Sequence, residues 1–518
     1  MAAKLMSAEE AVALVRDGAS IIVSCSGGGV NEPTKILAAL EQRFLTTGQP
    51  TNLTVCHPCG LGDHKGGGTD RFAHPGMTKR VIAGHWSWSP NICRMVMENE
   101  VEAYCLPQGV ISHLFRAIAG GHPGVITHVG LQTFVDPRLE GGKCNARTAE
   151  DLVHLIELAG QEQLFYPAFP VDVAVIRGTT ADEHGNVTME HEGVKLEALA
   201  AAQAAHNSGG LVLVQVKRLA QAGSLDPRQV QIPGILVDAI VVDEAQTMSA
   251  FTGHNPAYAG EIRLPVGSVP PMPLDIRKVI ARRAALELRP GAVCNIGFGI
   301  SDGVAAVAAE EGIFDRFTLT IEQGAVGGIP AGGGDFGLAA NAEAIMDAPY
   351  QFDFYDGGGV DTTFLSFAQV DTLGNVNVSR FAGRLIGPGG FINLSQNAKQ
   401  VVFCGALTAG GVDVRVQDGQ ITIAKEGKIS KFVPQVEQIT YSGAYARQRG
   451  QRALYITERA VLRLGEAGLE IIEIAPGVAL EKDVIGQMGF RPAVAPELKT
   501  MDPRLFRDAL LGLAASFK

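Results

Sequence analysis

The residue best suited to covalent chemistry is Glu322, which follows an apolar stretch within residues 320–324 (TIEQG). Seven glycines follow within residues 324–337, and two more glycine runs occupy 357–359 and 387–390. A carboxylate beside loops rich in backbone N–H groups could attack an activated carbonyl while the amides hold the oxyanion. From these residues alone, an ordinary acid in a turn that begins a helix explains Glu322 equally well.

Two other glycine patterns suggest different chemistry. Residues 299–303 (GISDG) match the nucleophile elbow of serine hydrolases, but that class needs an acid and then a histidine further along the chain. The last histidine is His254, so we interpret this run as a glycine-rich turn. Gly297 and Gly299 also resemble a loosened dinucleotide fingerprint, with Glu322 where a ribose-binding acid would lie. A nicotinamide-linked oxidoreductase therefore stays open as an alternative.

A third pattern, Cys56-His57-Pro58-Cys59, has the spacing of metal ligands. A closed zinc site needs four ligands, and no second Cys-x-x-Cys pair follows. We interpret these residues as buried thiols around a turn proline and predict no metal site.

Composition limits the class of protein. The 518 residues allow about three domains or two large ones, and the net charge of −11 argues against a nucleic-acid partner. No apolar stretch reaches the roughly 20 residues of a membrane-spanning helix. The N-terminus lacks the apolar core of a signal peptide, and the 8 cysteines are too scattered for a disulfide framework. We expect a cytoplasmic globular protein.

The elements around these motifs occur twice in the same order. Ser7 predicts a capped helix, followed by a strand over 19–24 and the glycine run 27–29. Asp275 predicts a second such helix, followed by a strand over 292–296 that ends at residues 297–299. This order is typical of an α/β fold whose ligands bind at the carboxyl ends of the strands.

A second repeat supports duplication. Residues 182–187 (DEHGNV) match residues 371–376 (DTLGNV), each run being a Gly-Asn turn between apolar strands. Strands are predicted at 211–214 and 401–403, and the helical spacing of Leu152, Val153, Ile156 and Ala159 predicts a helix. We expect two similar open α/β domains with largely parallel sheets, chance similarity being the alternative.

The predicted domains are residues 1–264 and 275–518, and the second contains Glu322. Between them, four prolines in residues 265–273 predict an extended linker over 265–274.

The chain resembles the family I CoA-transferases along nearly its whole length, and most closely the single-chain acetate/propionate type. The resemblance rests on residues 17–18, 107–109, 322–324, 327–328, 351–359, 374–381 and 389–391. It implies two similar open α/β domains, as the repeats do. It also implies transfer of CoA from a short-chain acyl-CoA to a free carboxylate, in ping-pong fashion, through a glutamyl-CoA thioester.

The resemblance also implies roles for particular residues. Glu322 is the nucleophile, and Gln108 donates to the substrate carboxylate or to an oxyanion. The amide of Gly389, with neighbours Gly387 and Gly390, is the first expected oxyanion donor. The amides of Gly297, Phe298, Gly299 and Ile300 are the second, and Arg380 could bind a CoA phosphate or the acid, or be an exposed surface charge.

We expect no permanently bound cofactor, because a carboxylate nucleophile is ionised near neutral pH without a metal or a base. The expected partners are an acyl-CoA, a short-chain carboxylate and further copies of the chain in a homodimer or homotetramer. An acyl-CoA hydrolase on the same scaffold and a non-catalytic CoA or sugar-phosphate sensor remain alternatives. The acid pair is not predicted.

Overall fold

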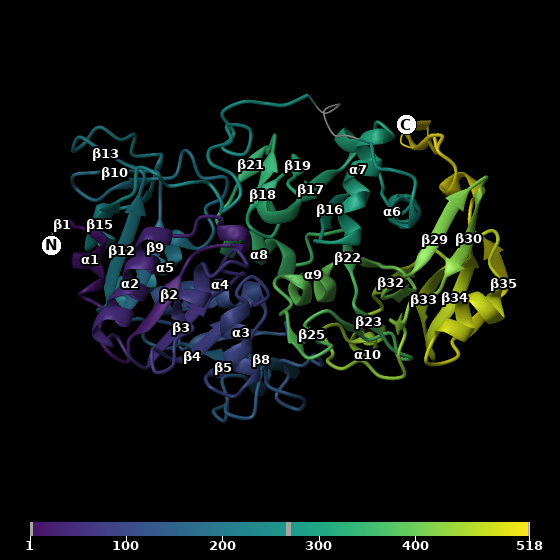
Figure 1. Ribbon diagram of the computed structural model, residues 1–518, viewed down its shortest axis with the longest axis horizontal. Coiled ribbons are helices and arrows are strands. Elements are labelled where there is room, and N and C mark those ends of the chain that lie inside the picture. The colour runs from purple at the N-terminus through teal and green to yellow at the C-terminus, as the bar shows by residue number, and fades with distance from the viewer. Residues whose placement is uncertain (1–3, 266–270, 516, 518) are drawn as a thin grey trace. The chain divides into compact units, whose positions relative to one another are not determined.

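The computed structural model describes residues 4–265, 271–515 and 517 (Figure 1). Its contacts divide the chain into two compact units. Unit 1 comprises Met1–Arg263, Ile321–Asp353 and Gly383–Asn393, and unit 2 comprises Leu264–Thr320, Phe354–Ala382 and Leu394–Lys518. Two segments of the second half, one with Glu322 and one with Gly389, thus belong to unit 1. The domain limits 1–264 and 275–518 stay a prediction, and the central residues of the predicted linker, 266–270, lie outside the described residues.

Unit 1 contains an eight-stranded sheet in the order β1-β15-β12-β9-β2-β3-β4-β5, and every adjacent pair is parallel. The central strands are apolar and almost wholly buried, as in a sheet covered by helices on both faces. The strands are β1 (Lys4–Leu5), β2 (Ser20–Val23), β3 (Leu53–His57), β4 (Thr78–Ala83), β5 (Glu102–Cys105), β9 (Val173–Arg177), β12 (Leu211–Val216) and β15 (Ala239–Val242). The helices are α1 (Ala8–Val12), α2 (Thr34–Thr47), α3 (Pro90–Met97), α4 (Gln108–Ala119) and α5 (Ala198–Asn207).

Unit 2 repeats this plan and extends it with three further strands, of which the first two are antiparallel to their predecessors and the last is parallel. Its sheet has the order β17-β16-β22-β27-β32-β33-β34-β35, in which the first five strands are parallel. These strands are β16 (Val293–Ile296), β17 (Thr318–Thr320), β22 (Thr362–Ser366), β27 (Gln400–Cys404), β32 (Arg452–Ile456), β33 (Ala460–Gly465), β34 (Gly468–Ile474) and β35 (Ala493–Thr500). The helices within unit 2 are α6 (Ile276–Ala285), α7 (Gly303–Glu310) and α10 (Gly443–Gln448). The predicted α/β class with largely parallel sheets is confirmed.

The two repeated turns have the same hydrogen bonds. Asp182 Oδ1 accepts from the backbone N–H groups of residues 184 and 186, and Asn186 Oδ1 accepts from Gly234 N–H. Asp371 Oδ1 accepts in the same way from residues 373 and 375, and Asn375 Oδ1 accepts from Gly443 N–H. An identical side-chain network in each unit supports duplication over chance similarity.

The predicted capped helices are present. Ser7 and Glu10 form a reciprocal capping box at α1, and Asp275 accepts from the N–H groups of Arg277 and Lys278 at α6. Since these contacts satisfy otherwise unpaired N–H groups, they explain where both helices begin.

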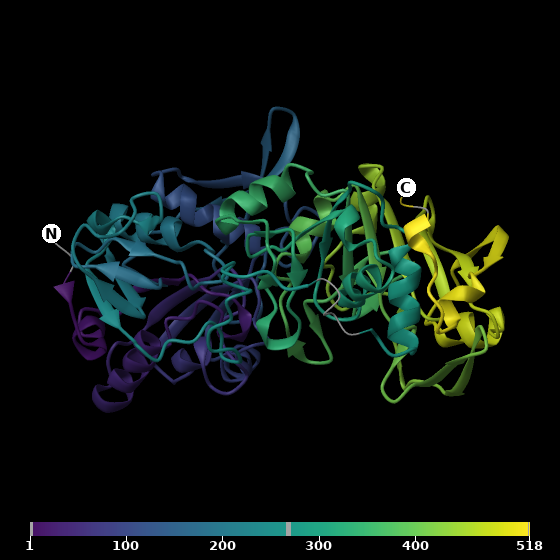
Figure 2. The same cartoon turned by 90° about the horizontal axis from the view of Figure 1, so that it is seen from above.

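The helix predicted around Ile156 is wrong. Strands β7 (His154–Leu158) and β8 (Gln161–Pro167) form an antiparallel hairpin, joined at Ala159 and Gly160, which both have positive φ. Residues 154–158 are mostly exposed, so they have no apolar face that a helix could bury. The two-residue turn instead fixes the pairing of the two strands. Figure 2 shows this hairpin, in blue, extending from unit 1.

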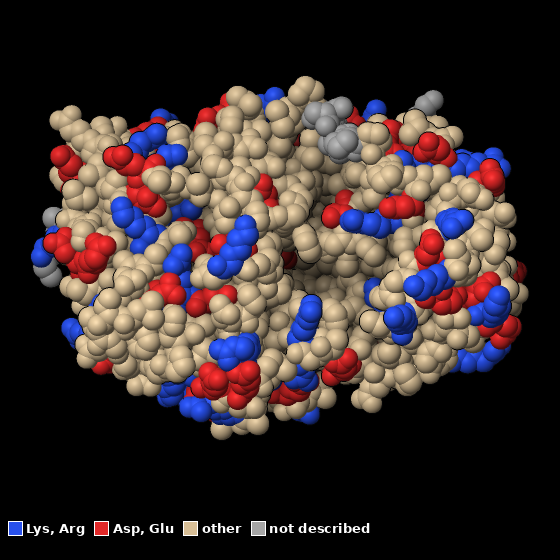
Figure 3. Space-filling view, in the orientation of Figure 1, with Lys and Arg blue, Asp and Glu red and all other residues tan. Residues whose placement is uncertain are grey.

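Short strands in unit 1 are β6 (Gly124–Thr127), β10 (Thr180–Asp182), β11 (Val187–Thr188), β13 (Arg218–Ala220), β14 (Val230–Ile232), β18 (Ala325–Val326), β19 (Ile329–Pro330), β20 (Ala339–Ala340), β21 (Ala344–Ile345) and β26 (Arg384–Leu385). Those in unit 2 are β23 (Gln369–Val370), β24 (Val376–Asn377), β25 (Arg380–Phe381), β28 (Thr408–Ala409), β29 (Asp413–Gln417), β30 (Gln420–Lys425) and β31 (Ile429–Ser430). Helices α8 (Ala348–Asp356) and α9 (Phe391–Asn397) each contribute residues to both units. On the face in Figure 3, basic and acidic side chains are interspersed.

Candidate active site

Glu322 lies in a tight turn of unit 1. Gly324 N–H donates to Ile321 O at 2.9 Å, and Ile321 N–H donates to Ala325 O at 2.9 Å. Gly324 has a φ of +114°, and a Cβ there would lie 2.1 Å from Met346 O, so only glycine fits. The turn therefore fixes the backbone that presents the Glu322 side chain.

The carboxyl group of Glu322 faces the backbone of Gly390. A Cβ built on Gly390 would lie 2.0 Å from Glu322 Oε2. Burial raises the pKa of Glu322 to about 7, while hydrogen bonds from the Gln323 side chain and the Gly390 N–H lower it in part. Burial thus favours the protonated form of Glu322 more than in an exposed glutamate.

The Gln108 amide approaches the same place. Gln108 begins α4, is fully buried, and its backbone N–H donates to Gly389 O at 3.1 Å. A Cβ at Gly389 would lie 3.4 Å from Gln108 Oε1 and 3.8 Å from Glu322 Oε1. Among the described residues, neither Gln108 Oε1 nor Nε2 has a hydrogen-bond partner. A buried, unsatisfied amide is costly, so this one is suited to bind a ligand.

The amide of Gly389, expected to be the first oxyanion donor, is bonded elsewhere. Its N–H donates to Gly84 O at 2.8 Å, within a contact that also joins Trp86 N–H to Ile386 O at 2.8 Å. Gly387 has a φ of +80° and packs directly against residues 84–86. The geometry therefore makes Gly390, not Gly389, the amide that faces Glu322.

Sequence reasoning missed His85. Its Cδ2 lies 4.0 Å from the Cβ position of Gly389, and its buried Nδ1 has no partner among the described residues. Burial lowers the pKa of His85 to about 4, so the ring is neutral at pH 7. The sequence signal that could have indicated this residue is the pair Gly84-His85, which directly follows the strand ending at Ala83.

The Cys-x-x-Cys run lies next to Glu322 and is hydrogen-bonded. Cys59 Sγ lies 3.3 Å from Ser26 Oγ, and Gln323 Nε2 donates to Ser26 Oγ at 3.3 Å. His57 Nδ1 lies 2.6 Å from Cys59 O. Burial, followed by the nearby Glu322 carboxylate, raises the pKa of Cys59 to about 11, which keeps this thiol protonated. The arrangement orients Gln323 and hence its contact with Glu322.

The remaining predicted site residues belong to unit 2. Gly297 N–H donates to Phe364 O at 2.8 Å, Gly299 has a φ of +109°, and Phe298 is exposed. Ile300 begins a short 3-10 turn, where buried Ser301 donates its hydroxyl to Gly297 O at 2.8 Å. This is the glycine-rich turn inferred from the sequence.

Arg380 lies in β25 of unit 2, and its backbone O accepts from Asn377 Nδ2 at 2.7 Å. Its role stays a prediction, as do those of Gly297, Phe298, Gly299 and Ile300.

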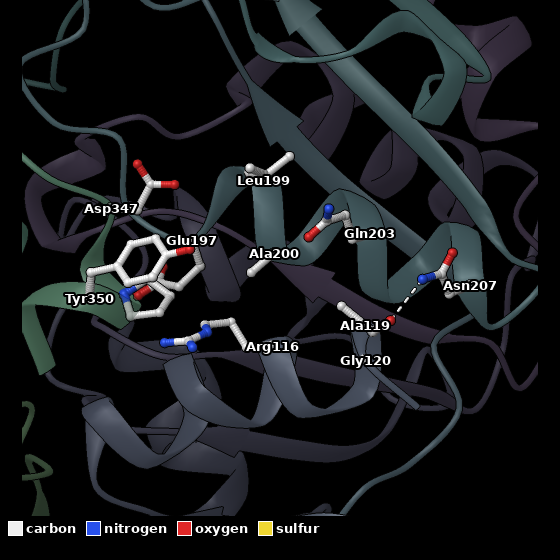
Figure 4. A pocket seen from close by; sticks show the side chains of 11 residues that line it. Arg116, Ala119, Gly120, Glu197, Leu199, Ala200, Gln203, Asn207, Asp347 and Tyr350 are labelled. Atoms are coloured by element: carbon white, nitrogen blue, oxygen red, sulfur yellow. Dashed lines mark hydrogen bonds between the residues drawn. The ribbon is translucent and has the colours of Figure 1, made fainter. Parts of the chain in front are cut away.

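Unit 1 also has a cavity of about 280 Å³ between α4, α5 and residues 347–350 (Figure 4). Arg116 stacks 4.8 Å from the Tyr350 ring centroid on one side. Buried Glu197 accepts from Ser112 Oγ at 2.6 Å, and its Oε2 has no partner among the described residues. Burial raises the pKa of Glu197 to about 7.

Comparison with known proteins gives the class of this α/β protein. Residues 5–243 match the family model described as coenzyme A transferase. The chain is 46% identical over 509 residues to the acetate CoA-transferase YdiF of Escherichia coli K12, covering 98% of this chain and 96% of that protein. The chain belongs to the coenzyme A transferase family, and the resemblance found in the sequence is confirmed.

Two further relatives extend this result. The caffeate CoA-transferase of Acetobacterium woodii is 46% identical over 519 residues, covering 99% of both chains. The crystal structure of the YdiF apoenzyme from Escherichia coli O157:H7 matches with a TM-score of 0.95 at 45% identity, over 99% of this chain and 97% of that one. A YdiF structure described as a thioester complex with CoA matches with a TM-score of 0.94, also at 45% identity and with the same coverage. Coenzyme A is the group transferred in this family, so the nicotinamide alternative loses its basis.

Within the described part of the chain, no helix combines the length and apolar character needed to cross a bilayer.

Proposed function

We propose that this protein transfers CoA from a short-chain acyl-CoA to a free carboxylate, with Glu322 as the nucleophile. The observation that supports it is the buried Glu322 carboxyl group at the Gly390 N–H, with the unpartnered Gln108 amide beside the neighbouring residue Gly389. Full-length similarity to acetate and caffeate CoA-transferases supports the reaction class.

The reaction begins when a Glu322 carboxylate oxygen attacks the thioester carbonyl carbon. The C–S bond breaks, CoA thiolate leaves, and a mixed glutamyl–acyl anhydride remains. The thiolate then attacks the glutamyl carbonyl, which releases the first acid and leaves a glutamyl-CoA thioester. The acceptor carboxylate reverses these steps, restoring the Glu322 carboxylate and forming the new acyl-CoA.

Each attack places negative charge on a carbonyl oxygen. The Gly390 N–H and the Gln323 side chain already donate to the Glu322 carboxyl group, and the unpartnered Gln108 amide could supply a further donor for that charge. Losing one such donor typically costs about 100–1,000-fold in rate. Because every step exchanges one activated carbonyl for another, no metal or nucleotide is required, and we propose that no cofactor is permanently bound.

Acetate and caffeate, the acids for which two relatives are named, differ greatly in size, although both relatives are 46% identical to this chain. Identity therefore does not select the acid, and we propose the acetate/propionate type from the sequence motifs alone. A homodimer or homotetramer and a cytoplasmic location remain predictions.

The deciding experiment is mass spectrometry of the intact protein and its peptides after incubation with acetyl-CoA and no acceptor. We expect a CoA adduct on the peptide containing Glu322, released by acetate or propionate and absent in Glu322→Gln. Exposed Glu343, which follows the glycine-rich run 324–337, gives the control Glu343→Gln, which should keep the adduct. Consumption of acetyl-CoA without an adduct would favour the hydrolase instead.

A further inference from the structure

Three potential metal ligands converge in unit 1, in a cluster that shares no residue with the candidate active site. His254 Nε2 lies 3.1 Å from Glu261 Oε1, and His191 Nε2 lies 3.6 Å from the same oxygen. One ligand atom from each residue lies within 4.8 Å of both others. The cluster is the one group of this kind found in the described ranges.

The spacing suits a small divalent cation. Zinc binds histidine nitrogen and carboxylate oxygen at about 2.0–2.2 Å in tetrahedral geometry, which places neighbouring ligand atoms about 3.3–3.5 Å apart. The two distances to Glu261 Oε1 lie on either side of that value. Small side-chain rotations would therefore complete three sides of a tetrahedron and leave the fourth for water.

The three side chains contact one another and are partly accessible to solvent. The rings of His191 and His254 lie 4.4 Å apart between centroids. His191 Nδ1 is buried without a partner in the described structure, so the polar contacts of this ring lie on its Nε2 side. The side chains of His191, His254 and Glu261 are 27%, 31% and 41% exposed, which gives a cation a path from solvent.

We propose that His191, His254 and Glu261 form a binding site for a first-row divalent metal ion, with Zn²⁺ as its probe. Two imidazoles and one carboxylate match the donors that zinc and its neighbours prefer. The role proposed for this site is structural and distinct from that of Glu322.

The consequence of binding would be local stabilisation. His254 and Glu261 lie in a segment without regular structure after β15, whereas His191 follows β11. The same segment reaches the glycine-rich loops, because Ala250 N–H donates to Gly28 O at 2.8 Å and Thr252 Oγ1 donates to Asp335 Oδ2 at 2.6 Å. A bound metal would tie this segment to the β11 loop and resist its local opening.

The test is Zn²⁺ binding to the full chain, measured by competition with a chromogenic chelator, together with thermal melting with and without Zn²⁺. We expect one tightly bound Zn²⁺ per chain and a higher melting temperature in its presence. The double variant His191→Ala/His254→Ala should bind at least about 100-fold more weakly, since even an outer-shell change costs about 10–100-fold. Its melting temperature should no longer respond to Zn²⁺.

The matched control is His154→Ala/His184→Ala, which removes two exposed histidines from elsewhere in unit 1. Equal binding by the wild type and the His191/His254 variant would overturn the proposal, as would a wild type that binds no Zn²⁺. Glu261→Gln keeps both histidines and the side-chain shape, and it should weaken binding while the apo-protein melts normally. None of these measurements involves CoA, so their failure leaves the role proposed for Glu322 intact.

Discussion

Gly390→Ala offers a direct test of the Glu322 geometry. The φ of Gly390 lies outside the left-handed range, so alanine suits the backbone there. The new Cβ would lie 2.0 Å from Glu322 Oε2, and real Cβ contacts are essentially never below 3.0 Å. The carboxylate oxygen must therefore move by about 1 Å, and a misplacement of that size can cost about 100-fold in rate.

Stability should respond much less than rate. The atom in the way is the end of a flexible side chain, and the next neighbour, Phe352 Cε1, is 3.4 Å from the new Cβ. We expect kcat/KM for acetyl-CoA and propionate exchange to fall by at least about 100-fold, with a melting temperature near that of the wild type. The glutamyl-CoA adduct should form correspondingly more slowly.

Gly332→Ala is the control. Gly332 lies in the long glycine-rich run, its φ is also outside the left-handed range, and no atom lies within 4 Å of its Cβ position. This variant should keep its activity. If Gly390→Ala exchanges CoA at the wild-type rate, the Glu322 orientation seen here is not the reactive one, and the reasoning is refuted.

Three more predictions concern the buried polar groups of unit 1. Gln108→Ala should lower kcat/KM about 100–1,000-fold without lowering the melting temperature, because the lost amide has no protein partner; a parallel loss of stability would indicate a structural role. Since burial raises the pKa of Glu322 to about 7, kcat/KM should rise with pH up to about 7 and then level off; a flat profile between about pH 5 and 8 would contradict this. Burial raises the pKa of Glu197 from an ordinary 4.5 to about 7 in the folded chain, so the folded state holds its proton more tightly and stability falls as pH rises across that window. Glu197→Gln should therefore raise the free energy of unfolding above pH 7 by up to about 3 kcal/mol, with no gain below about pH 4.5, as urea unfolding at several pH values would show.

The features that could be predicted from the sequence are those set by short-range chemistry. Capping side chains such as Ser7 and Asp275 satisfy N–H groups within three residues, so the start of each helix is encoded locally. The Asp-x-x-Gly-Asn turns are local in the same way. The region around Ile156 was mispredicted because its apolar spacing fits a helix, whereas the Ala159–Gly160 turn and its partner strand decide the structure.

The candidate site was predictable in its residue types but not in its contacts. Glu322, Gln108 and the loop at 387–390 are 65 or more residues apart in sequence, and unit 1 brings them together. Which amide of that loop faces the carboxyl group depends on the bond from Gly389 to Gly84, a pairing between distant segments. His85 was missed for the same reason, since its neighbours come from another part of the chain.

The groups around Glu322 are consistent with the nucleophile role proposed for it, despite its raised pKa. Burial destabilises the carboxylate anion. The groups that stabilise this anion in part, the Gln323 side chain and the Gly390 N–H, are neutral hydrogen-bond donors. A cation in their place would lower the pKa further but would also make the oxygen less nucleophilic. Neutral donors leave the Glu322 oxygen basic. In a poorly solvated site, such donors also strongly stabilise the negative charge that forms on the carbonyl oxygen. In the proposed mechanism the same burial excludes water, which would otherwise hydrolyse the anhydride and turn a transferase into a thioesterase.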